Sequence, residues 1–296
     1  MYLVVGANGF LGSYVLKNIL ESTNEEIVAT TRNIDCVSKG PRISWVSCDV
    51  AEFSQVDSLL HFIKSKTHEM LKVVYCAAYH NPDLVEENPR VAWNINVTSL
   101  SYFLNRLENV ACLFYPSTDS VYGESVDGYH FSENDALKPV NTYGKQKVVA
   151  EQLVRGCGYN VVRYPFLISP SLSPVKKHFY DKIVNDLQQG KKLEMFKDSL
   201  RSTISFNQAA NLLVKLMESY SEALPKTMNV CGDDDLSKYD VGVLLARKLN
   251  ISDDMVVPIS ICDKNEIFKA KRASSTLMSN ALIKKVLNLS NISLQL

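Results

Sequence analysis

Three glycines near the start of the chain constrain the fold more than any other feature. Gly6, Gly9 and Gly12 follow an apolar strand pattern over residues 2–5 and open a helical pattern over residues 10–21. Three glycines alone are a weak signal, because glycines also mark ordinary turns. Between a strand and a helix, the first glycine allows a tight turn, the second a close phosphate approach, and the third close helix packing. Free amides and the helix dipole then predict a pyrophosphate-binding loop.

The rest of the first half alternates strand and helix patterns. Such repeats predict an α/β fold with a Rossmann-type, doubly wound parallel sheet, because each crossover must pass over a sheet face. The regularity fades after Pro165, which predicts a Rossmann domain over residues 1–164 and a smaller C-terminal substrate-binding lobe, mainly residues 165–296, with some segments returning to the sheet. The expected strands are 2–5, 27–31, 43–48, 72–76, 112–116 and 160–164; the expected helices are 10–21, 54–66, a long one ending near 107, 143–156, 178–189 and 207–219.

Composition argues against several classes of protein. Lys plus Arg equals Asp plus Glu, at 32 each, so no net charge favours a nucleic acid or membrane partner. No apolar run approaches the roughly 20 residues of a membrane span, and the first residues lack the basic leader of a signal peptide. The seven cysteines form no CxxC pair, and the five histidines lack metal-ligand spacing. We therefore expect a cytoplasmic protein with reduced thiols and no metal, and we interpret His80 as an ordinary loop residue.

The residues at the end of the second strand indicate which dinucleotide is bound. An acidic residue at this position binds the ribose hydroxyls of NAD, but the sequence here contains Thr31 and Arg32 and no acid. An arginine can bind the 2′-phosphate of NADP, with help from Thr31, so NADP(H) is favoured and NAD(H) stays open. Asp49, at the end of the third strand, is placed to meet the adenine region, and it can also serve as the N-cap of the next helix.

The chemistry is carried by Tyr143, Lys147 and Thr118. Tyr143 and Lys147 are four residues apart on a predicted helix and share a face, so the ammonium should lower the phenol pKa from its usual value of about 10. A tyrosine of this kind exchanges a proton with a carbonyl or alcohol oxygen while hydride moves to or from nicotinamide. Thr118 lies at the carboxyl end of a strand, where open α/β sheets bind ligands. The competing interpretations are a helix-surface pair and a simple turn.

These motifs together resemble the extended short-chain dehydrogenase/reductases of the NAD-dependent epimerase/dehydratase superfamily. Within it the chain most resembles the dTDP-4-dehydrorhamnose reductase family, and the resemblance covers nearly the whole chain. The stretches that carry it, besides the glycine loop, are Ser117-Thr118-Asp119, Tyr143-Gly144-Lys145-Gln146-Lys147, Cys76-Ala77-Ala78-Tyr79, Asn94-Ile95-Asn96-Val97 and Pro139-Val140-Asn141-Thr142, and less closely Arg201-Ser202-Thr203 and Arg272-Ala273-Ser274-Ser275-Thr276-Leu277.

The resemblance implies roles for these residues. Tyr143 is the general acid, Lys147 holds the nicotinamide ribose and tunes Tyr143, and Thr118 orients the substrate carbonyl. Asn96 supports the lysine and a proton relay, or else is a buried polar residue satisfied by backbone. The full cofactor-binding set predicted is Gly6, Asn8, Gly9, Phe10, Leu11, Gly12, Thr31, Arg32, Asp49, Val50, Ala77, Ala78, Tyr79, Asn96, Tyr143 and Lys147.

Three positions depart from the family pattern. The dehydratases carry a glutamate where this chain has Ser120, which argues against 4,6-dehydration because the second acid-base group is missing. The reductases usually have serine and tryptophan soon after the strand arginine, whereas this chain has Arg163-Tyr164-Pro165-Phe166, which alters the substrate pocket. Gln146 replaces a serine before the lysine and is expected to point elsewhere on the helix.

The predicted function is that of an oxidoreductase. The resemblance implies NADPH-dependent reduction of a nucleotide-linked 4-keto-6-deoxy sugar, for deoxysugar or surface polysaccharide synthesis, with a homodimer left open. Two alternatives remain. One is a nucleotide-sugar epimerase of the same superfamily that keeps its cofactor bound, and the other is a non-catalytic regulatory protein that binds the dinucleotide.

Overall fold

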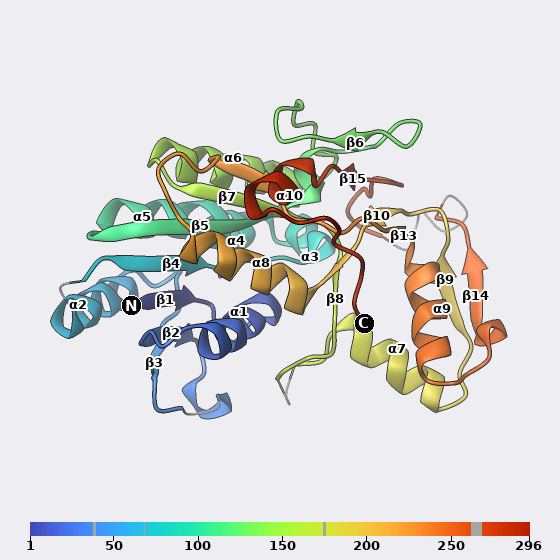
Figure 1. Cartoon of the computed structure of the whole chain (residues 1–296), viewed down its shortest axis with the longest axis horizontal. Helices are drawn as coiled ribbons and strands as arrows, with labels where there is room; N and C mark the ends of the chain where they lie inside the picture. The colour runs from blue at the N-terminus through green and yellow to red at the C-terminus, as the bar shows by residue number, and fades with distance from the viewer. Residues whose placement is uncertain (38–39, 68, 174–175, 262–267) are drawn as a thin grey trace.

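Seven parallel strands form the sheet at the centre of the structure, a computed structural model that describes residues 1–37, 40–67, 69–173, 176–261 and 268–296 (Figure 1). From edge to edge the strands are β12 (Thr227–Asn229), β7 (Asn160–Tyr164), β5 (Val110–Thr118), β4 (Leu71–Tyr75), β1 (Tyr2–Val5), β2 (Ile27–Thr31) and β3 (Ile43–Ser47). The chain leaves β1 in one direction and returns beyond it at β4, so the strand order reverses between them. Ligands of open α/β sheets bind at the carboxyl ends of the strands beside such a reversal.

Helices cover both faces of the sheet, as the alternating pattern predicts. The inner strand β1 is apolar along its whole length and fully buried, because both faces of the sheet are covered there. One face packs against α1 (Phe10–Ser22), α8 (Phe206–Glu218) and α10 (Ala281–Leu287), and the other packs against α2 (Phe53–Lys66), α5 (Ser99–Arg106) and α6 (Thr142–Gly156). The doubly wound sheet expected from the sequence is therefore present.

The predicted long helix ending near residue 107 is wrong in one respect, because it is broken into pieces. The chain forms α3 (Pro82–Glu87), α4 (Pro89–Trp93), a π-helical segment η2 (Asn94–Thr98) and then α5. Pro89 occupies the first turn of α4, because proline lacks the amide that would continue α3. The wider turn of η2 buries Asn96 beside the sheet.

Beyond β7 the chain forms a second apolar cluster and then returns to the sheet. The cluster is built by α7 (Phe179–Gln188), β9 (Leu193–Phe196), α9 (Lys238–Lys248) and β14 (Val256–Ile259). Sequence patterns missed α9, α10 and the short strand β12. Short paired segments link the lobe to the sheet: β8 (Leu167–Ile168) with β11 (Ile204–Ser205), β10 (Arg201–Ser202) with β13 (Asp235–Leu236), and β6 (His130–Phe131) with β15 (Leu277–Met278). The described residues also form short turns of 3₁₀-helix at η1 (Ile34–Cys36), η3 (Asp119–Val121) and η4 (Asp253–Met255).

Candidate functional site

The loop between β1 and α1 has the geometry that its glycines predict. Gly6 has a φ of +80°, and a Cβ there would lie 2.9 Å from a backbone nitrogen of the loop after β4. A Cβ on Gly12 would overlap the carbonyl oxygen of Gly6, so the close packing of α1 requires glycine. Gly9 is the N-cap of α1 and makes no side-chain cap. The first-turn amides of Phe10 and Leu11 are therefore available to an anion.

Thr30, which sequence reasoning missed, holds this loop in place. The amide of Gly6 donates to the hydroxyl oxygen of Thr30 at 2.9 Å, and the amide of Ala7 donates to its carbonyl at 3.0 Å. The Asn8 side chain donates to the hydroxyl of Thr31 at 3.5 Å. The end of β2 and the glycine loop therefore form one rigid wall. A threonine at the end of an inner strand was the signal available in the sequence.

The residues predicted at the adenosine end lie along the same edge. Arg32 is exposed and makes no hydrogen bond or ion pair with any residue that the structure describes. The Asp49 carboxylate accepts the amide of Ala51 at 3.0 Å, and the N-cap of α2 is Glu52, so the N-cap alternative for Asp49 is wrong. The acid forms a tight turn before the helix instead. Val50 is buried beneath it.

Asn96 supports the loop after β4 and makes no hydrogen bond to the predicted lysine. Its carbonyl oxygen accepts the Tyr79 amide at 2.8 Å, and its amide group donates to the Tyr79 carbonyl at 3.1 Å and to Gln146 at 2.9 Å. The side chain of Asn96 is thus satisfied by the Tyr79 backbone and by Gln146, and its part in a proton relay stays a prediction. Gln146 does not point away as expected, because it is buried against Asn96. The pair fixes the wall that contains Ala77 and Ala78.

Helix α6, which carries Tyr143 in its first turn, begins against the end of β5, where Thr118 lies. Asn141 caps α6 by accepting the amide of Gly144 at 2.8 Å. A Cβ on Gly144 would overlap the carbonyl oxygen of Ser120, so the helix start lies directly on the Ser-Thr-Asp turn. This close approach brings the tyrosine, in the first turn of α6, to the strand end that carries the threonine.

The electrostatics of Tyr143 differ from the expectation. Burial, with the Asp119 carboxylate as a second cause, raises the pKa of Tyr143 above its usual range. We had expected Lys147 to lower this pKa. A phenol with a raised pKa stays protonated at neutral pH, which is the form that a general acid needs.

Lys147 lies beneath the site and is completely buried. Its ammonium donates to the hydroxyl oxygen of Tyr115 at 2.6 Å and to the carbonyl of Pro116 at 2.7 Å. Burial lowers the pKa of Lys147 to about 7, although the Glu151 carboxylate opposes the shift. Glu151 is itself bound by Ser117 and by Arg163. Sequence reasoning did not select Tyr115, because a tyrosine within a buried strand looks like any core residue.

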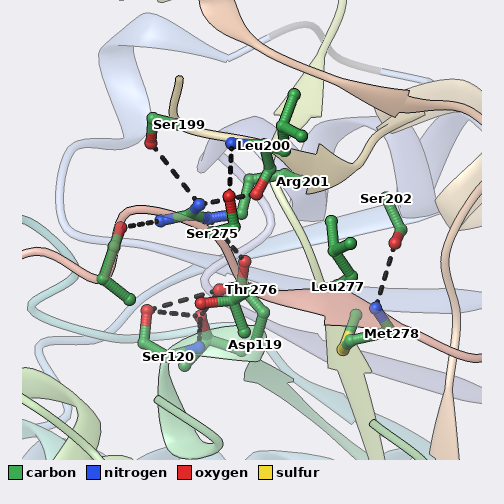
Figure 2. Close-up of polar contacts among 12 residues, drawn as sticks. Asp119, Ser120, Ser199, Leu200, Arg201, Ser202, Ser275, Thr276, Leu277 and Met278 are labelled. Carbon is green, nitrogen blue, oxygen red and sulfur yellow. Dashed lines mark hydrogen bonds and ion pairs between the residues drawn. The ribbon is translucent and has the colours of Figure 1, made fainter. Parts of the chain in front are cut away.

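A partly buried ion pair joins Asp119, the residue after Thr118, to Arg201 of β10 (Figure 2). Thr118 donates to Asp119 at 2.9 Å, and Asp119 is paired with Arg201 at 3.2 Å. The guanidinium of Arg201 also donates to the carbonyls of Leu200 and Ser274, at 2.7 and 2.9 Å. In the sequence, Arg201 belongs only to a stretch that resembles the family less closely. In the structure it joins three separate segments at the site.

The lobe contains a cavity of about 310 Å³ with cations beside it. Lys238 lies 5.3 Å from the ring of Phe179, and burial, followed by the charges of Arg201 and Arg272, lowers the Lys238 pKa. Arg272 is paired with Asp83 at 2.7 Å, but its other terminal nitrogen is buried and has no hydrogen-bond partner among the residues that the structure describes. Three cations thus lie together here, and one has an unused donor. The aromatic lining of the cavity is Phe179, Phe196 and Phe268.

Two histidines and a lysine border the start of α1. His178 packs against the ring of Phe10, with centroids 4.7 Å apart, and His80 lies 6.5 Å from it. Burial lowers the pKa of His178 to about 4 and lowers that of His80 as well, so both are neutral at pH 7. Lys176 donates to the carbonyl of Asn8 at 2.7 Å. His80 thus borders the glycine loop, which an ordinary loop histidine need not do.

Two negative findings apply to the part of the chain that the structure describes. No group of three or more His, Cys, Asp and Glu side chains there is placed to hold a metal ion. No helix within those residues has both the length and the apolar character needed to cross a membrane.

Comparisons with known proteins agree with this geometry. Residues 1–294 match the family described as "RmlD substrate binding domain". The chain is 26% identical over 265 residues to the methionine adenosyltransferase 2 subunit beta of Danio rerio, covering 87% of this chain and 76% of that protein. Its fold matches the dTDP-4-dehydrorhamnose reductase of Bacillus anthracis in complex with NADP (TM-score 0.77, 20% identity, 99% and 94% of the two chains). It also matches the UDP-glucuronic acid 4-epimerase of Bacillus cereus with UDP-glucuronic acid and NAD (TM-score 0.80, 18% identity, 98% and 93%).

Proposed function

Since the chain belongs to the RmlD substrate binding domain family, a branch of the extended short-chain dehydrogenase/reductases, we propose that it reduces a nucleotide-linked 4-keto-6-deoxy sugar with NADPH. The product would serve deoxysugar or surface polysaccharide synthesis. The observation that supports this proposal is that α6, which carries Tyr143 and Lys147, packs against β5, which ends at Thr118. A nicotinamide cofactor bound at the glycine loop and the proton donor Tyr143 on α6 would then act on the same substrate.

Each of the three residues has a distinct part in the reaction. When bound, the nicotinamide supplies hydride to the keto carbon. The buried phenol of Tyr143 gives its proton to the carbonyl oxygen, so that the ketone becomes a secondary alcohol and NADPH becomes NADP⁺. Thr118 orients the same oxygen by hydrogen bonding. Lys147 holds the nicotinamide ribose. Its positive charge also stabilises the phenolate that Tyr143 becomes when its proton leaves.

The lobe supports a nucleotide-linked substrate. Lys238 and Arg272 would bind a diphosphate, because they are half-buried cations and a donor nitrogen of Arg272 has no partner among the described residues. The cavity beside Lys238 is lined by three phenylalanine rings, against which a nucleobase can stack. Arg201 connects this region to the turn that carries Thr118. A sugar would therefore reach Tyr143 while its nucleotide occupies the lobe.

The test is the loss of NADPH absorbance on addition of freshly generated dTDP-4-keto-6-deoxyglucose. We expect oxidation by the wild-type protein and at least a 100-fold lower rate in Tyr143→Phe, which removes only the proton donor. NADPH should bind both proteins equally, as followed by its fluorescence. Absence of oxidation with dTDP- and UDP-linked 4-keto sugars, despite NADPH binding, would contradict the proposal.

One alternative follows from a comparison. The similarity to a methionine adenosyltransferase subunit favours a dinucleotide-binding regulatory protein that turns over no sugar. In that case Tyr143→Phe should leave binding of a protein partner intact, and no sugar would be reduced.

The structural likeness to an epimerase with NAD favours a second alternative, which predicts NAD that copurifies with the protein and is not exchanged.

A further inference from the structure

The ammonium of Lys147 is held by two fixed oxygen atoms on β5. A lysine ammonium has three protons to donate and accepts none. One goes to the Tyr115 hydroxyl at 2.6 Å and another to the Pro116 carbonyl at 2.7 Å, with the nitrogen 4.0 Å from the centre of the Tyr115 ring. Only one proton remains for a ligand. Its direction is fixed by the other two.

Asn96, to which the family resemblance assigns the support of the lysine, is occupied elsewhere. Its side chain is buried, and its hydrogen bonds go to both backbone groups of Tyr79 and to Gln146. The hydroxyl of Tyr115 is the side-chain group that contacts the lysine nitrogen. Within the described residues, the direct hydrogen bonds of the Lys147 ammonium thus go to β5.

We propose that Tyr115 is a positioning residue that holds the Lys147 ammonium so that its remaining proton points to the reacting edge. The proposal rests on the proposed function for the role of Lys147, but the hydrogen bond itself can be tested without a substrate. The Tyr115 oxygen favours the charged lysine, because it accepts a hydrogen bond from the ammonium in a buried site. Without it, one ammonium proton has no partner, and the neutral amine becomes the favoured form.

Several groups surround the lysine. Glu151, one turn along α6, and Cys76, after β4, raise its pKa, and the charge of Lys147 in turn lowers the pKa of His80. Tyr115 and Tyr143 are phenols whose pKa values are raised by burial, so both are neutral near pH 7. Burial remains the largest effect on Lys147, and it brings the pKa to about 7. The lysine therefore titrates near neutral pH, where a shift in its pKa on loss of a hydrogen-bond acceptor can be measured.

The chain offers a matched control. Tyr75 on β4 is also buried, with its ring centre 6.4 Å from that of Tyr115, but its hydroxyl has no hydrogen-bond partner in the part of the chain that the structure describes. Tyr115→Phe and Tyr75→Phe thus remove the same atom from neighbouring positions. Only the first removes an acceptor from Lys147.

The experiment measures the free energy of unfolding of the full chain between pH 6 and 9, in urea, with and without Lys147→Met in each background. A lysine whose pKa is lowered in the folded state binds fewer protons there than in the unfolded chain, so stability rises with pH above the folded pKa. Subtracting the Lys147→Met series isolates this contribution. We expect the rise to begin about one pH unit lower in Tyr115→Phe than in the wild type, and to be unchanged in Tyr75→Phe.

Two further readouts separate positioning from a general loss of stability. The alkaline limb of kcat/KM for the reductase reaction should move down by about the same unit in Tyr115→Phe, and NADPH affinity at pH 8 should fall several-fold. A lowered unfolding free energy with an unchanged pH dependence would overturn the proposal. If the wild-type protein reduces no sugar, the proposed function fails, while the unfolding series still decides the part of Tyr115.

Discussion

We expect Arg32 to determine whether the protein prefers NADPH or NADH. It follows β2 without an acidic neighbour to bind ribose hydroxyls, and its guanidinium is exposed. We expect Arg32→Ser to weaken NADPH binding about 10-fold and to leave NADH binding unchanged, because only NADPH carries the 2′-phosphate. Fluorescence titration with both cofactors measures this. Arg155→Ser, an exposed change in the last turn of α6, is the control. An equal loss for both cofactors would assign Arg32 to the pyrophosphate instead.

Single residues were predictable from the sequence where a local motif fixes them. The glycine loop, Thr118 and the Tyr143–Lys147 pair could be found because each lies at a strand end or within one helix. The partners of Lys147 could not, because Tyr115 looks like a core residue until α6 is packed on β5. The prediction that Gln146 points away was wrong for the same reason, because helix spacing alone does not show which face of α6 is covered.

At the scale of elements, the contact between α1 and the loop before it requires glycine at position 12. An added methyl group at Gly12 overlaps the Gly6 carbonyl, so Gly12→Ala should lower the free energy of unfolding by about 2 kcal/mol and weaken cofactor binding. Gly156→Ala, near the end of α6 with open space around it, should raise stability by about 0.5 kcal/mol. Urea unfolding compares them. Equal effects would show that α1 can shift to accept the methyl group.

Elements were predicted best where the sheet imposes a simple pattern. The strands β1, β2 and β7 match their expected bounds, because inner strands of a covered sheet are rich in apolar and β-branched residues. The helix before β5 was predicted as one piece, since its apolar spacing continues through Pro89 and the π-helical segment η2. Strand β12 was missed because three residues are too few for a periodic signal.

The whole molecule depends on contacts between segments that are distant in the sequence. Arg201 binds Asp119 of the sheet edge and the backbone of residues 273 and 274 (Figure 2). The segment that contains Arg201 is joined a second time to the chain after residue 273, because the amide of Met278 donates to the hydroxyl of Ser202 at 3.0 Å. Thr118 donates to the other oxygen of Asp119, so the position of the turn that carries Thr118 depends on the lobe. No local pattern in the sequence records such a connection.

Arg201→Met should therefore lower the free energy of unfolding by about 3 kcal/mol at pH 8, because it leaves the buried Asp119 carboxylate without its partner. Burial already raises the pKa of Asp119, and Arg201 opposes that shift. Without the arginine the pKa rises further, the folded state takes up a proton as the pH falls, and the deficit should shrink between pH 8 and pH 5. Arg247→Met, which removes an exposed pair with Asp253, should change little at either pH. A deficit that is independent of pH would mean that the lost backbone contacts of Arg201, and not the charge of Asp119, hold the lobe against the sheet.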